Sequence, residues 1–197
     1  MIKPAKTKFD IHPLIKKRFS PRGYSDEQVL KEELNRMLEA ASWASSSFNE
    51  QPWRFILGIK NEGEGYDKIF QCLTDKNKTW AITAQVLLLT LSKKTLIGNG
   101  AQNRFHSYDT GQAMAMMSIQ AVNDNIFITQ MGGFNSDLAR ELFKISDDYE
   151  ILACVAVGKI NYEAQAKQTF REENLIYRTR NDLSEFVFVN DFGNSYK

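Results

Sequence analysis

Residues 84–91 form a nearly continuous apolar run, with Gln85 as its main interruption. A short run of this kind predicts a β-strand that is buried on both faces of a sheet. Shorter apolar segments at 54–59, 126–128 and 151–157 predict further strands. Helical patterns separate these segments, so the sequence predicts an α/β or α+β fold around a buried sheet.

Several amphipathic helices are predicted between the strands. Ser25 to Gln28 has the pattern of a capping box, in which a hydroxyl and an amide satisfy the first N–H groups of a helix that ends near Trp43. The inward face of that helix would carry Leu30, Leu34, Met37, Leu38 and Ala41. Further helices are predicted at residues 10–18, 66–73 and 108–122, and after Asn135-Ser136-Asp137. The helix at 108–122 is apolar or small over most of its circumference, which predicts burial on all sides. The segment 185–190 alternates in polarity and predicts an edge strand or an arm.

The overall composition excludes several classes of protein. A length of 197 residues fits one domain, so we expect residues 1–197 to fold as a single unit. The net charge of +1 and the lack of a long basic run argue against a nucleic-acid partner. The sequence contains no run of 18 apolar residues, so no membrane span is predicted, and the mixed N-terminal segment does not resemble a secretory signal. We therefore expect a cytoplasmic protein without a membrane partner.

Side chains for metal or hydrolytic chemistry are scattered along the chain. Cys72 and Cys154 lie far apart, and His12 and His106 have no ligand spacing, so no metal site is predicted. The sequence contains no nucleophile elbow, no phosphate-binding P-loop and no dinucleotide fingerprint. Its carboxylates form no recognisable acid–base pair, so we name no catalytic residue.

A basic segment follows the first predicted helix. Arg18, Ser20 and Arg22 place two guanidinium groups and a hydroxyl within five residues. Such groups can surround a phosphate through charge-assisted hydrogen bonds, although a solvated basic loop has the same composition. Near the C-terminus, Arg178 and Arg180 form a second basic pair. Alone this pair indicates surface charge, and together with the first segment it could complete a phosphate cage.

A polar segment connects the second predicted helix to the first strand, in a place where ligand-binding loops often lie. Its hydroxyl and amide side chains suit a heteroaromatic ring that mixes donors and acceptors, or a sugar-alcohol chain. These residues are Ser45, Ser46, Ser47, Asn49 and Gln51. A plain connector is the alternative. Gly132 and Gly133 would let the backbone approach a flat ligand, or would form an ordinary turn.

Taken in this order, these segments resemble the nitroreductase family. The similar stretches are Arg18 to Arg22, Ala44 to Trp53, Asp109 to Ala113, Met131 to Phe134 and Arg178 to Arg180. The resemblance spans the chain from about Ile15 to Phe192. It implies an α+β, three-layer sandwich in which helices flank a central, mostly antiparallel sheet. It also implies an intertwined homodimer with FMN at the interface and the C-terminal segment 181–197 as an arm exchanged between subunits, within which Phe186 to Asn190 would join the partner's sheet.

The same resemblance implies a role for each candidate site residue. Arg18, Ser20, Arg22, Arg178 and Arg180 would hold the FMN phosphate. Ser45, Ser46, Ser47, Asn49 and, more weakly, Gln51 would face the ribityl chain and the pyrimidine ring, and a backbone N–H of Gly132 or Gly133 would lie beside the flavin N5. The implied reaction is hydride transfer from NADH or NADPH through the flavin to a small acceptor such as a nitroaromatic or a quinone.

The sequence departs from the family pattern at three positions and leaves other functions open. Ser45 replaces the usual proline, Phe48 a small residue, and Phe19 a frequently basic one. The open alternatives are flavin-destroying or dehalogenating chemistry on the same fold, a flavin-binding or dimeric interaction protein without turnover, and a phosphate-ligand protein unrelated to flavin.

Overall fold

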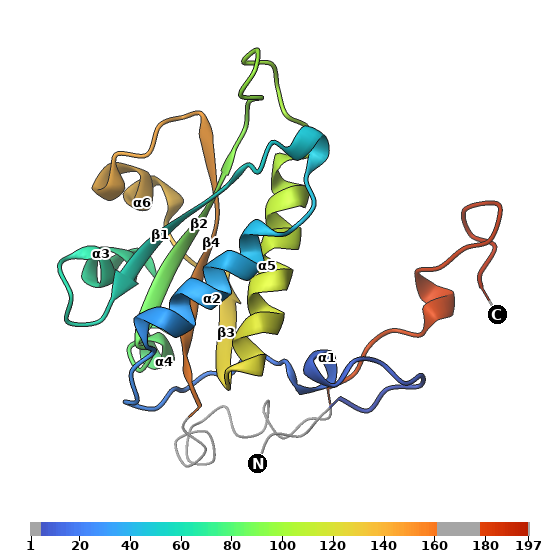
Figure 1. Cartoon of the computed structure of the whole chain (residues 1–197), viewed down its shortest axis with the longest axis horizontal. Coiled ribbons are helices and arrows are strands. Elements are labelled where there is room, and N and C mark those ends of the chain that lie inside the picture. The colour runs from blue at the N-terminus through green and yellow to red at the C-terminus, as the bar shows by residue number, and fades with distance from the viewer. Residues whose placement is uncertain (1–4, 161–177, 197) are drawn as a thin grey trace.

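The computed structural model describes residues 5–160 and 178–196. Its centre is an antiparallel sheet with the strand order β1-β2-β4-β3 (Figure 1). The strands are β1 (Trp53–Ile59), β2 (Val86–Lys93), β3 (Ile126–Met131) and β4 (Tyr149–Lys159). The predicted α+β class with an antiparallel central sheet is therefore confirmed.

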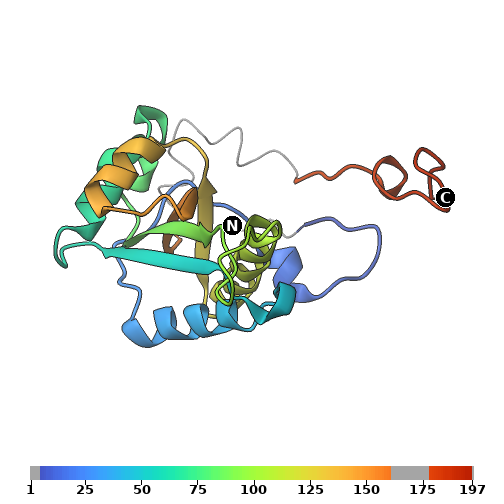
Figure 2. The same ribbon diagram turned by 90° about the horizontal axis from the view of Figure 1, so that it is seen from above.

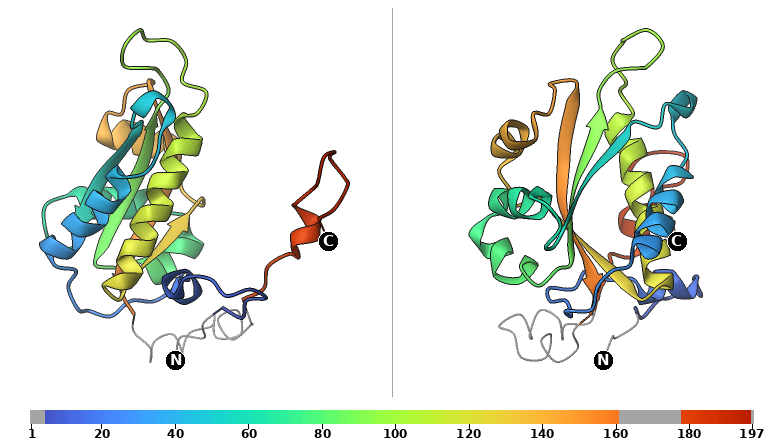
Figure 3. Two further views of the ribbon diagram at one scale, coloured as in Figure 1. Left: turned by 45° about the vertical axis from the view of Figure 1, so that its right-hand side comes forward. Right: turned by 60° about the vertical axis from the view of Figure 1, so that its left-hand side comes forward.

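Helices cover both faces of the sheet and complete three layers (Figure 3). On one face lie α2 (Lys31–Ser42) and α5 (His106–Asn123), and on the other lie α3 (Gly65–Cys72), α4 (Asp75–Ala81) and α6 (Ser136–Phe143). Side chains of β2 alternate between two cores, because Val86 and Leu88 pack with the α2–α5 layer whereas Leu87 and Leu89 pack with the opposite layer. This arrangement confirms that the apolar run forms a strand buried on both faces.

The second helix begins later than the sequence predicts. α2 starts at Lys31, and the Glu33 carboxylate accepts a hydrogen bond from the Leu30 N–H at 2.7 Å. The predicted capping box at Ser25 is wrong, because the Ser25 N–H donates to Lys159 O at 2.8 Å and ties this segment to the end of the sheet. The Ser25 hydroxyl is buried without a hydrogen-bond partner among the described residues.

The long helix α5 is also different from its prediction. It buries Met114, Met117 and Ala121 against the sheet, but Tyr108 and Ala115 are exposed. In the single chain, the prediction that this helix is buried on all sides is therefore wrong, because α5 lies in an outer layer beside α2 (Figure 3). Its exposed face carries no charged residue; the exposed positions are Ser107, Tyr108, Gly111, Ala115, Met116 and Asn123.

The remaining short elements agree in part with the sequence. α1 (Pro13–Lys17) is shorter than predicted, and α6 begins at its predicted cap, where the Asn135 side chain accepts from the Leu138 N–H at 3.0 Å. The helix α4 and two 3₁₀ turns, Ser47–Asn49 and Leu183–Glu185, are not predicted.

Residues 178–196 extend away from the body of the molecule (Figures 1 and 2). They do not form an edge strand of the sheet, since Phe188 makes an isolated β-bridge with Ser195. Phe186 is exposed and Phe192 is 94% exposed. The segment thus has the form of an arm, and its docking on a second subunit stays a prediction.

A close contact between β1 and α3 at Gly58 leads us to expect an effect of substitution on stability. A Cβ added at Gly58 would lie 2.5 Å from the backbone nitrogen of Tyr66. We expect Gly58→Ala to destabilise the fold by about 3 kcal/mol, the upper end for an overpacked site. For a chain of this size that lowers Tm by roughly 6–12 °C in a thermal-unfolding measurement. Gly98→Ala is the matched control, because no atom lies within 4 Å of its added Cβ, and a Tm equal for both variants would contradict the contact.

Candidate functional site

The first basic segment lies along β3. The hydroxyl of Thr129 donates to Pro21 O at 2.6 Å, and the rings of Phe19 and Phe127 are 5.2 Å apart. β3 is an edge strand, so this segment covers one rim of the sheet. Phe19, which departs from the family pattern, thus serves as the apolar anchor of the segment.

Arg178 joins this segment from a distant part of the chain. Its guanidinium group donates to Arg18 O at 2.5 Å and to Lys16 O at 2.7 Å, and it lies 5.8 Å from the centre of the Phe19 ring. The structure therefore brings the two predicted basic motifs together across 160 residues of sequence.

The guanidinium groups of Arg18, Arg178 and Arg180, here called the arginine cluster, repel one another. Burial lowers the pKa of Arg18, and the charge of Arg180 lowers it further. Burial is also the main cause of a lowered pKa at Arg178, followed by the charges of Arg18 and Arg180. Within residues 5–160 and 178–196, no carboxylate forms a salt bridge with Arg18 or Arg180. An anion bound here would relieve the repulsion.

Two further predicted phosphate ligands belong to the same segment. The exposed Ser20 places its hydroxyl 3.5 Å from an Arg18 guanidinium nitrogen. Arg22 is half-buried. The arginine cluster and Ser20 thus present charged and neutral donors at one rim of the sheet.

The predicted polar loop lies between α2 and β1 and has an unusual backbone. Phe48, Asn49 and Gln51 have φ angles of +53°, +56° and +46°. Non-glycine residues seldom adopt this left-handed region, and such conformations concentrate at functional sites. Hydrogen bonds hold the loop, because the Gln51 N–H donates to Ser46 Oγ at 3.1 Å and the Gln51 side chain donates to Asn49 O at 3.1 Å.

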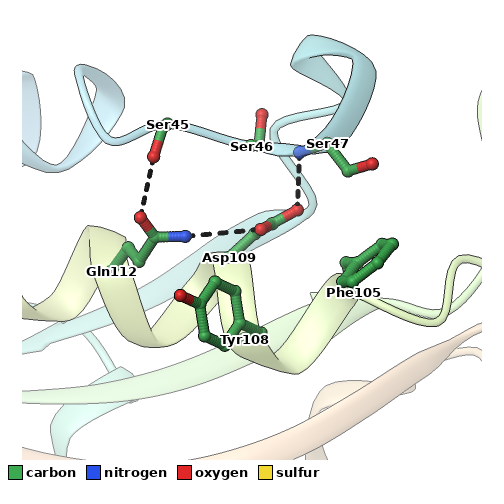
Figure 4. Close-up of a pocket in the computed structure, with 7 residues that line it drawn as sticks. All are labelled: Ser45, Ser46, Ser47, Phe105, Tyr108, Asp109 and Gln112. Carbon is green, nitrogen blue, oxygen red and sulfur yellow. Dashed lines mark hydrogen bonds between the residues drawn. The ribbon is translucent and has the colours of Figure 1, made fainter. Parts of the chain in front are cut away.

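A pocket of about 350 Å³ lies between this loop and the start of α5 (Figure 4). Its lining residues are Ser45, Ser46, Ser47, Phe105, Tyr108, Asp109 and Gln112. The three serines are predicted site residues. The other four residues are not predicted; three of them belong to α5, and Phe105 directly precedes it. Asp109 and Gln112 do have a sequence signal, because they are polar residues directly before the apolar stretch Ala113 to Met117 of the same helix.

The glycine pair follows β3. Gly133 O accepts from the Thr74 N–H at 3.1 Å and from the Asn77 side chain at 2.9 Å. A Cβ on Gly133 would lie 2.9 Å from that Asn77 nitrogen, whereas Gly132 is exposed with open space around it. Gly133 therefore has a packing reason to be glycine. Both glycines belong to the same edge of the sheet as the arginine cluster.

The predicted site residues fall into two separate groups. The loop contacts Asp109 and Gln112 near the start of α5, whereas Lys17, next to Arg18, contacts Val122 O and Asn125 near its end. From residue 109 to residue 122 is 13 residues, or roughly 20 Å along a helix. Within a single chain, the loop therefore lies apart from the arginine cluster.

The described part of the chain contains neither a cluster of metal-ligating side chains nor a helix able to cross a membrane. No three His, Cys, Asp or Glu side chains there are grouped so that they could hold a metal ion. None of the described helices has the length and apolarity that crossing a membrane requires.

The chain thus combines a three-layer α+β fold and an antiparallel sheet with a cationic rim and a strained polar loop. The chain belongs to the nitroreductase family, whose profile, described as "Nitroreductase family", matches residues 15–159. The predicted family is thereby confirmed.

Individual relatives agree with this assignment. A crystal structure of an oxidoreductase containing FMN is 28% identical and covers 97% of both chains with a TM-score of 0.89. A provisionally assigned nitroreductase from Desulfovibrio desulfuricans, solved in complex with FMN, shares the fold at 21% identity with a TM-score of 0.72, over 93% of this chain and 99% of that one. MhqN of Bacillus subtilis, whose name provisionally assigns it as an NAD(P)H nitroreductase, is 19% identical over 82% of this chain and 93% of its own length.

Proposed function

We propose that this protein is an FMN-dependent oxidoreductase that uses NADH or NADPH to reduce a small acceptor, such as a nitroaromatic or a quinone. The observation that carries the proposal is the arginine cluster, which gathers positive charge while no carboxylate of the described residues pairs with Arg18 or Arg180. The FMN contained in two solved relatives and the nicotinamide in the name of a third support the choice of cofactor. The cytoplasm is the proposed location, because both nicotinamides are available there.

The phosphate end of FMN fits the arginine cluster. A phosphate monoester carries up to two negative charges and several acceptor oxygens, which match guanidinium forks in charge and in geometry. Arg18, Arg178 and Arg180 would supply the charge, and Ser20 a neutral donor. Arg22 is proposed as a further ligand from the same segment.

The ring and ribityl chain of FMN fit the strained loop. Ser45, Ser46 and Ser47 line the pocket with hydroxyl groups, and the exposed Asn49 and Gln51 of the same loop are proposed to add amides. Such groups match a pyrimidine ring and a sugar alcohol, each of which mixes donors and acceptors. The backbone of Gly132 or Gly133 is proposed to lie beside the flavin N5.

A homodimer would join the two halves of this site. The loop and the arginine cluster lie roughly 20 Å apart along α5 in one chain, so a second copy must bring its loop to the first copy's arginines. The uncharged exposed face of α5 and the exposed aromatic side chains of the arm are surfaces that a second copy would cover. We propose that residues 181–197 exchange between two such single-domain subunits.

The protein's own residues would bind and orient the cofactor. When bound, FMN would supply the redox chemistry that links the nicotinamide to the acceptor. The arginine cluster would hold the phosphate end, and the loop would set the position of the ring. Since no side chain has to serve as a nucleophile, we assign no catalytic residue.

Spectroscopy tests the proposed function directly. We expect the purified protein, or the protein after addition of FMN, to show bound-flavin absorption that bleaches anaerobically with NADH or NADPH. A protein that stays colourless and does not bind added FMN would refute the proposal. Tight FMN binding without bleaching would instead indicate a flavin-binding protein without turnover, and product analysis would detect dehalogenating or flavin-destroying chemistry.

A further inference from the structure

Three hydrogen bonds link the strained loop to α5 in a chain (Figure 4). The Ser45 hydroxyl donates to Gln112 Oε1 at 2.7 Å, and Gln112 Nε2 lies 3.5 Å from Asp109 Oδ1. The second Asp109 oxygen, Oδ2, accepts from the Ser47 N–H at 3.0 Å. The Asp109 carboxylate is therefore linked to the loop twice, directly by the Ser47 N–H and indirectly by way of Gln112.

Asp109 is unusual as a buried acid. Asp109 is 3% exposed, and no cation of the described residues forms a salt bridge with it. Its position in the first turn of α5 stabilises the negative charge, since the free N–H groups of a helix start carry partial positive charge. An ionised carboxylate only accepts hydrogen bonds, so both of its neighbours must donate to it.

This requirement determines the direction of the whole chain of bonds. Gln112 must turn its NH₂ group toward Asp109, which leaves its carbonyl oxygen facing Ser45. The single proton of the Ser45 hydroxyl is then used on Gln112. Toward the pocket, Ser45 can present only lone pairs, and so it acts as an acceptor.

We propose that Asp109 is a positioning residue with two roles, and this inference rests on the proposed function. It anchors the strained loop through the Ser47 N–H, and through Gln112 it makes Ser45 a hydrogen-bond acceptor. The ligand group beside Ser45 must then carry an N–H or O–H. In FMN, the ring imide and the ribityl hydroxyls have this chemistry.

A double-mutant cycle tests the polarity role. We expect Ser45→Ala to weaken FMN binding by about tenfold, near the value of one hydrogen bond of about 1.4 kcal/mol, and Asp109→Asn to weaken it at least as much, because that change also loosens the anchor. The double variant should bind about as weakly as Asp109→Asn alone, because the Ser45 contact depends on Asp109. The loss of FMN affinity caused by Arg18→Ala, in contrast, should multiply with the loss caused by either of these substitutions. Asp137→Asn, an exposed acid in the first turn of α6, is the matched control and should leave the affinity unchanged.

Amide hydrogen exchange tests the anchoring role without a ligand. In the FMN-free protein, Asp109→Asn should accelerate exchange at the Ser47 amide by about tenfold, since its acceptor is weakened, while amides of β2 stay protected. Gln112→Met should leave the Ser47 amide protected from exchange. In that background, Asp109→Asn and Ser45→Ala should no longer be coupled in their effects on FMN affinity. The second variant also keeps the test decisive if Asp109→Asn does not fold.

Each result decides one part of the inference. An unchanged exchange rate of the Ser47 amide in Asp109→Asn would overturn the anchoring role. If the effects of Ser45→Ala and Asp109→Asn on FMN affinity were fully additive, the polarity role would be overturned. A wild-type protein that binds no FMN would overturn the proposed function and the ligand assignment with it. The exchange measurement would still decide the anchor in that case.

Discussion

Replacing Arg18 and Arg180 together by alanine is expected to weaken FMN binding by on the order of 10²–10⁴-fold. Each lost hydrogen bond to a charged phosphate contributes about 1.5–3 kcal/mol, and tenfold in affinity corresponds to about 1.4 kcal/mol. The double variant leaves Arg178 in place, because that residue also holds the Arg18 and Lys16 carbonyl groups and supports the segment. Titration of FMN-free protein by flavin fluorescence at constant ionic strength measures the change.

Riboflavin is the control ligand for this prediction, because it has the ring and ribityl chain without the phosphate. Its affinity should be similar in the wild-type protein and in the double variant. Arg36→Ala is the control substitution, since Arg36 forms surface ion pairs on α2 with Glu32 and Asp124. An equal loss of affinity for riboflavin and FMN would show that the arginine cluster does not bind the phosphate.

Phe48→Pro is expected to weaken FMN binding by on the order of 100-fold. Phe48 has a φ of +53°, whereas the proline ring holds φ near −65°, so the loop must rearrange at a cost of about 3 kcal/mol. The Phe48 side chain is 89% exposed, so the backbone and not the loss of packing would explain the effect. The same fluorescence titration measures the affinity.

Phe48→Gly separates the backbone from the side chain. Glycine adopts positive φ without strain, so the affinity of this variant should stay within about threefold of wild type. If both substitutions weaken binding equally, the aromatic side chain itself contacts the ligand. If neither does, the loop conformation does not matter for binding, and the role proposed for Ser45 to Ser47 is wrong.

Features based on short-range patterns could be predicted from the sequence. The apolar run that forms β2 is uninterrupted enough to indicate burial on both faces, and the Asn135 cap lies directly before α6. The capping box at Ser25 failed because a backbone bond to Lys159, far away in sequence, competes with the local pattern. The sequence does not predict α4, because its seven residues contain only one large apolar anchor, Trp80.

The candidate site shows a similar limit. The residue types of Arg18 and Arg178 indicate phosphate chemistry, but no spacing rule predicts contact across 160 residues. A lone acid such as Asp109 on a helix normally indicates a solvated position, and only the fold shows that it accepts from the loop. The placement of the loop and the arginine cluster near opposite ends of α5 is likewise a property of the tertiary structure.

A heterodimer with two different defects tests the central claim most directly, namely that one FMN site is built from two copies of the chain. One copy carries Arg18→Ala with Arg180→Ala, the other carries Phe48→Pro, and separate affinity tags isolate the mixed dimer after co-expression. One of its two sites would then combine an intact arginine cluster with an intact loop, as twofold symmetry requires. We predict one tightly bound FMN per mixed dimer, while each homodimeric variant binds FMN weakly. A mixed dimer with no tight FMN site, or a failure of the two copies to associate, would contradict the account.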